Sequence, residues 1–154
     1  MSKLIIRGAL ANAGSEVKTD ELLEFLMNET KDTEFYKLSP APGIIMNTAL
    51  DWQIILGSTA SVITIAQIFW SAYKKFILPL KKKGKQNTFL FVTVENHKRD
   101  FAQFTIGRKY QSEEMFIQEF TEKVTKIRHK TDPEEMELKI RETSSSMTWK
   151  KYRK

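Results

Sequence analysis

Cysteine is absent from this 154-residue chain, and histidine occurs only as His97 and His129. Without cysteine the chain has no disulfide, no Cys-ligated zinc site, no iron–sulfur cluster and no thiol nucleophile. Two histidines also exclude a His-rich metal site. The motifs of P-loop, dinucleotide-binding, zinc-protease and serine-hydrolase proteins are missing as well. We therefore expect a protein that is not an enzyme, with no catalytic residues, no metal and no cofactor.

Positive charge is present in excess, but it is unevenly placed. The chain carries 25 basic and 19 acidic residues, a net charge of +6. Residues 1–70 hold five bases and eight acids, or −3, so residues 71–154 carry +9. Such basic clusters attract phosphate, anionic lipid or acidic protein, although many are only solvated surface. The candidate partner-binding residues are the bases of a predicted linker and a predicted turn, with two aromatics of the C-terminal tail: Lys81, Lys82, Lys83, Lys85, Lys98, Arg99, Trp149 and Tyr152.

The hydrophobic periodicity predicts an α+β fold, a small mixed sheet packed by helices. Strands are expected near residues 3–8, 35–38, 88–95 and 101–106, and helices near 19–30, 58–77 and 112–130, with a short C-terminal helix. We expect residues 1–130 to form one domain containing an apolar helical segment, 44–80. Residues 131–154 are expected to form the short helix and a basic mobile tail.

Local signals support several of these elements. Residues 88–95 and 101–106 flank the polar stretch Asn96–Asp100, which predicts a hairpin with a solvated His97 in its turn. Phe89 and Phe91 are similar to the aromatics of RNA-recognition sheets, but the glycine–aromatic–glycine spacing is missing. We interpret them as core residues, so nucleic-acid binding is the weakest functional alternative. Ser112 is a predicted N-cap for the helix that follows it.

The stretch Gln53–Tyr73 leaves two interpretations open. It has 21 residues without a formal charge, and a helix of that length would span about 31 Å, roughly a hydrocarbon core. Trp52, Trp70 and Tyr73 would then mark the ends of an inner-membrane, single-pass segment. The Gly57-Ser58-Thr59 break and the apolar face of the helix after it favour instead a helix buried in a cytoplasmic domain.

One known family combines these features in the same order. The carriers are an opening strand and helix, the turn Pro40-Ala41-Pro42-Gly43, the segment Ala49–Ser58, an apolar helix ending in Trp70, a basic stretch, a hairpin and a helix. From Lys3 to Ile127 this order resembles the effector-associated constant components of bacterial conflict systems.

The resemblance implies a non-catalytic accessory subunit, or adaptor, of a bacterial antiviral defence system. Such a subunit binds a separately encoded effector, often a protease-like one, by protein–protein contact. The family supplies no catalytic residues. We expect the partner to be encoded nearby; the membrane-inserted form is the alternative interpretation.

Overall fold

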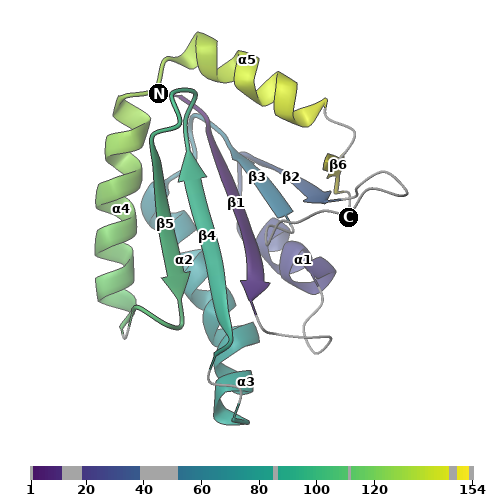
Figure 1. The fold of residues 1–154 in the computed structure, drawn as a ribbon, viewed down its shortest axis with the longest axis vertical. Coiled ribbons are helices and arrows are strands. Elements are labelled where there is room, and N and C mark those ends of the chain that lie inside the picture. The colour runs from purple at the N-terminus through teal and green to yellow at the C-terminus, as the bar shows by residue number, and fades with distance from the viewer. Residues whose placement is uncertain are drawn as a thin grey trace.

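A six-stranded antiparallel sheet organises the part of the chain that the computed structural model describes, residues 2–11, 19–38, 52–84, 87–110, 112–145 and 149–152 (Figure 1). The strand order is β5-β4-β1-β3-β2-β6. The strands are β1 (Leu4–Ala11), β2 (Thr33–Leu38), β3 (Trp52–Leu56), β4 (Phe89–Glu95), β5 (Phe101–Ile106) and β6 (Trp149–Lys151). The α+β class is confirmed. The described strand pairs are all antiparallel, however, and the expected mixed sheet does not occur among them.

Helices lie on both faces of this sheet, but unequally (Figure 1). They are α1 (Thr19–Glu29), α2 (Val62–Ala72), which continues through a π-helical turn (Tyr73–Ile77) into α3 (Leu78–Lys82), α4 (Glu113–His129) and α5 (Pro133–Ser144). α1, α2 and α4 cover one face, which we call the inner face. α5 crosses only one end of the opposite, outer face. The predicted cap at Ser112 is confirmed, since its side chain accepts the amide of Met115, and Asp132 caps α5 by accepting the amide of Glu135.

The main core lies between the inner face and its helices. Phe116, Phe120 and Val124 of α4 are fully buried, and the Phe120 ring lies 4.8 Å from that of Phe104 on β5. A second, smaller cluster lies under α5. There Met136 and Ile140 pack with one side chain from each of three strands, namely Ile5, Tyr36 and Ile55.

The apolar stretch from Gln53 to Tyr73 is not one helix. Trp52–Leu56 form β3, which lies between β1 and β2 with all five residues buried, and α2 begins only at Val62. A short run that is mostly apolar and does not alternate fits a strand covered on both faces as well as it fits a helix. None of the helices formed by the described residues is long and apolar enough to cross a membrane.

The membrane interpretation is therefore wrong for this segment. Trp52 is fully buried and stacks on Phe69 at 6.1 Å. Trp70 and Tyr73 lie 4.9 Å apart between ring centroids and are also buried in the main core. The three aromatics thus pack inside the domain instead of at a lipid interface.

The expected mobile tail also differs from the structure. Trp149–Lys151 form β6, which pairs antiparallel with β2 at the edge of the sheet. Three residues in a basic segment are too short to show a strand period, so the sequence gives no signal for this pairing.

Candidate functional site

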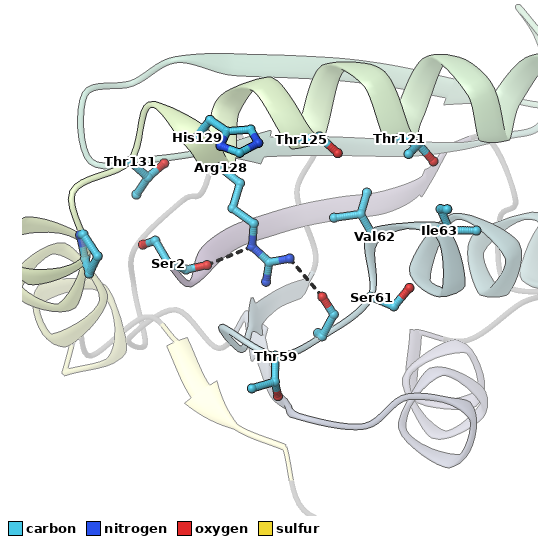
Figure 2. Close-up of a pocket in the computed structure, with 12 residues that line it drawn as sticks. Ser2, Thr59, Ser61, Val62, Ile63, Thr121, Thr125, Arg128, His129 and Thr131 are labelled. Carbon is cyan, nitrogen blue, oxygen red and sulfur yellow. Dashed lines mark hydrogen bonds between the residues drawn. The ribbon is translucent and has the colours of Figure 1, made fainter.

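A cavity of about 600 Å³ lies beside the start of α2 and the last turns of α4 (Figure 2). Small hydroxyl side chains and apolar groups line most of it, and Arg128 enters it from α4. Its lining residues are Ser2, Thr59, Ala60, Ser61, Val62, Ile63, Thr121, Thr125, Arg128, His129, Thr131 and Pro133.

Arg128 is the buried charge of this cavity, with 8% of its surface exposed. Its Nε donates to the Ser2 carbonyl at 2.9 Å, and its two terminal nitrogens donate to the carbonyls of Ala60 at 2.9 Å and Gly57 at 2.6 Å. Burial lowers the pKa of Arg128, and the charge of Asp32 acts in the opposite direction. A guanidinium remains charged at neutral pH in spite of this.

These three hydrogen bonds join segments that are far apart in the sequence. Ser2 precedes β1, Gly57 and Ala60 form the turn between β3 and α2, and Arg128 lies in the last turn of α4. Because three of its five N–H donors are used on backbone carbonyls, we assign Arg128 to the stability of the fold.

A polar network crosses the outer face where α5 begins to cover it. Arg7 on β1 forms an ion pair with Glu95 on β4 and donates to Gln53 Oε1 at 2.8 Å. The Nζ atom of Lys139 on α5 lies 3.5 Å from Glu95 Oε2 and donates to the Asn96 carbonyl at 2.9 Å. Glu95 is therefore balanced by two cations. The sequence signal for this network is a charged residue, Arg7, within an otherwise apolar strand.

His97 is not solvated, in contrast to the expectation. Its side chain is 5% exposed, and its Nε2 atom lies 3.0 Å from Glu135 Oε2 on α5. The reason is that α5 folds back over the hairpin turn, which a local reading of the turn cannot show.

The predicted basic contacts do not form one surface. Lys81, Lys82 and Lys83 lie at the end of α3, below the sheet in Figure 1. Lys98 and Arg99 lie in the β4–β5 turn, at the opposite end of the sheet. Lys85 lies outside the described residues. The two groups of bases would therefore contact different parts of a partner.

The predicted tail contacts lie at the β2 edge. Trp149 pairs with Leu38 through its backbone. The Tyr152 amide donates to the Phe35 carbonyl at 2.8 Å, and its hydroxyl donates to the Asp20 carbonyl on α1 at 3.4 Å. Burial raises the pKa of the Tyr152 hydroxyl, and the charges of Asp20 and Glu24 add to this.

Aromatic side chains lie on the outer face of β4 and β5. Phe89 and Phe91 are partly exposed, and Phe101 is 62% exposed. The alternate residues Leu90, Val92 and Val94 enter the main core instead. The interpretation of Phe89 and Phe91 as core residues was wrong, because one face of β4 has no described helix over this end.

No protein-family model, no curated protein and no solved structure matches this chain.

Proposed function

We propose that this protein is a non-catalytic adaptor that binds a separately encoded effector protein, as its resemblance to effector-associated constant components implies. We propose further that the effector binds at the β2 edge by replacing β6. The observation that supports this proposal is the pairing of β6, a three-residue strand at the sheet edge, with one half of the six-residue strand β2.

The attachment of β6 is weak enough to be reversed. Its described contacts include the pairing of three residues, the bonds from Tyr152 to Phe35 and Asp20, and the packing of Tyr152 against the main core. A backbone hydrogen bond contributes about 1 kcal/mol net, so breaking the hydrogen bonds of this strand costs roughly 2–4 kcal/mol. That cost is below the global stability of an ordinary domain, so the edge can open without unfolding.

Once β6 is released, β2 would offer a row of backbone donors and acceptors to a partner strand. Strand addition of this kind gains affinity from main-chain hydrogen bonds and specificity from the alternate side chains. β6 pairs only with Tyr36–Leu38, whereas β2 begins at Thr33. A partner strand that pairs with all six residues would therefore form a longer ladder than β6 does.

A disulfide lock tests the proposal, and the cysteine-free chain makes it specific. Lys37 and Lys150 are direct cross-strand partners, so their Cα atoms are about 4.5–5.5 Å apart, within the range that a disulfide bridges. In the Lys37→Cys, Lys150→Cys variant, oxidation should abolish capture of the neighbouring gene product, and reduction should restore it. The single Lys150→Cys variant is the matched control.

Truncation separates this proposal from its closest competitor, in which the tail itself is the binding element. Deletion of residues 149–154 removes the strand that competes with the partner, so affinity should rise. Loss of binding on deletion would assign recognition to the tail. Unchanged binding by the oxidised double variant would refute a role for the β2 edge.

A further inference from the structure

The outer face of β4 and β5 is open over the end away from α5 (Figure 1). α5 packs over Ile5, Tyr36 and Ile55 and reaches β4 through the contact of Lys139 with Glu95. Phe89 is the first residue of β4, and this end of the strand lies near α3 in Figure 1. Among the described residues, no helix covers Phe89 or Phe91 on this face.

Phe89 and Phe91 form a spaced pair of rings on this face. They are two residues apart on one strand, which places them about 6.6–6.8 Å apart along it. The cross-strand neighbours of Phe91 are Ala9 and Thr105, which are both small. Small neighbours leave room beside the partly exposed Phe91 ring for a planar group.

Cations lie beside the first of these rings. The Arg108 guanidinium carbon is 5.5 Å from the centroid of the Phe89 ring. Gly107, next to Arg108, accepts a hydrogen bond from Lys81 Nζ at 2.6 Å. This contact brings the end of α3, with Lys82 and Lys83, to the same end of the sheet.

Negative charge does not cancel this patch. The ion pairs among the described residues include none to Arg108, Lys82 or Lys83. The acid on the same face of β4 is Glu95, which lies at the far end and is balanced by Arg7 and Lys139.

We propose that this face binds single-stranded nucleic acid, with bases stacked on Phe89 and Phe91 and phosphates held by Arg108, Lys82 and Lys83. Paired rings and adjacent cations match the two parts of a nucleotide, its base and its phosphate. An acidic peptide would use the cations but not the rings. A single strand fits because its bases are free to stack on a flat sheet, whereas a duplex keeps them inside. This inference rests on the outer face alone and not on the proposed adaptor function.

Fluorescence anisotropy with labelled 12-mers tests it on the full chain. The probes are oligo-dT, oligo-U and the dA·dT duplex of the same length. We expect both single strands to bind more tightly than the duplex, and the comparison of dT with U shows which sugar is preferred. Three cations, Arg108, Lys82 and Lys83, predict a slope of log affinity against log salt of about −2, and Arg108→Ala should reduce its magnitude by about 0.7.

Two variants isolate stacking from folding. Phe91→Leu keeps an apolar side chain at the site but removes the ring, and it should weaken single-strand binding about tenfold. Exposed Ile63→Leu on α2 is the matched control and should bind like the wild type. Thermal unfolding of each variant checks that the fold is intact.

Any of four results would overturn the inference, and the first three concern the affinities themselves. They are absence of single-strand binding at about 50 mM salt, duplex binding as tight as single-strand binding, and Phe91→Leu binding equal to wild type. Displacement of the strand by a polyglutamate peptide of equal charge, with the same affinity, would also overturn it and assign the face to an acidic protein.

Discussion

Replacing Arg128 with methionine should remove a large part of the stability of this protein. Methionine has a similar length and fills much of the same space, but it cannot donate a hydrogen bond. The carbonyls of Ser2 and Ala60 would lose the donor from Arg128, and the Gly57 carbonyl would keep only the bond from the Ala60 amide at 3.2 Å. A buried carbonyl without a partner costs about 1–3 kcal/mol.

The expected loss is smaller than three full penalties. The adjacent cavity of about 600 Å³ lets water reach part of the site, and methionine does not carry the desolvation cost of the guanidinium. We therefore expect Arg128→Met to lower the free energy of unfolding by about 3–5 kcal/mol. In a chain of this size that corresponds to a fall in Tm of roughly 6–20 °C.

Urea unfolding followed by circular dichroism measures this loss. Arg128→Lys should recover only part of it, because one ammonium cannot reproduce the planar fork that bonds three carbonyls. Exposed Lys126→Met, on the same helix, is the matched control and should change stability by less than about 0.5 kcal/mol. A loss below 1 kcal/mol in Arg128→Met, or full recovery in Arg128→Lys, would refute the assignment of Arg128 as a structural clamp.

Two further predictions concern the packing of the sheet and the turn beside it. A Cβ atom at Gly8 would lie 2.4 Å from the Phe91 carbonyl oxygen and 2.4 Å from the buried Trp52 ring. Gly8→Ala should therefore lower the free energy of unfolding, measured in urea, by about 2–3 kcal/mol. An unchanged urea midpoint would show that β1 can shift. The hydroxyl and amide of Thr59 hold the pKa of Asp32 below its ordinary value of 3.8. The ionised carboxylate therefore stabilises the fold above pH 3.8, and this stabilisation is lost as the pH falls through the pKa of the folded state. Asp32→Asn should therefore be less stable than wild type at pH 7, with a gap that narrows toward pH 3; a constant gap would exclude the ionised form as the cause.

The hairpin and α4 were predictable because their signals are local. Residues 89–95 and 101–106 flank a polar turn, and the helix after Ser112 has a cap and an apolar stripe. Each of these signals lies within one element or between neighbours in sequence.

β3 and β6 were missed because their pairings are not local. Trp52–Leu56 are apolar at every position except Gln53, so the run shows no regular alternation and periodicity does not separate a central strand from a helix. β6 has only three residues, and its partner β2 lies more than a hundred positions away in the chain. The open outer face was missed for a related reason, since exposure of Phe89 and Phe91 depends on where α5 ends.

Arg128 shows the same limit at the level of a site. A base in the last turn of a helix is typical of a favourable interaction with the helix dipole. Its actual acceptors are 126, 68 and 71 positions away along the chain. Only the tertiary fold brings the residue before β1 and the β3–α2 turn to one guanidinium at the end of α4.

The two proposed binding surfaces are far enough apart to act independently. β6 and β4 are four strand steps apart in the sheet order, and neighbouring strands lie about 4.8 Å apart, so about 19 Å separates them. The oxidised Lys37→Cys, Lys150→Cys variant should therefore bind the oligo-dT 12-mer with wild-type affinity. Phe91→Leu should in turn leave capture of the effector unchanged. A parallel loss of both activities in either variant would mean that one surface, or one conformational change, serves both partners.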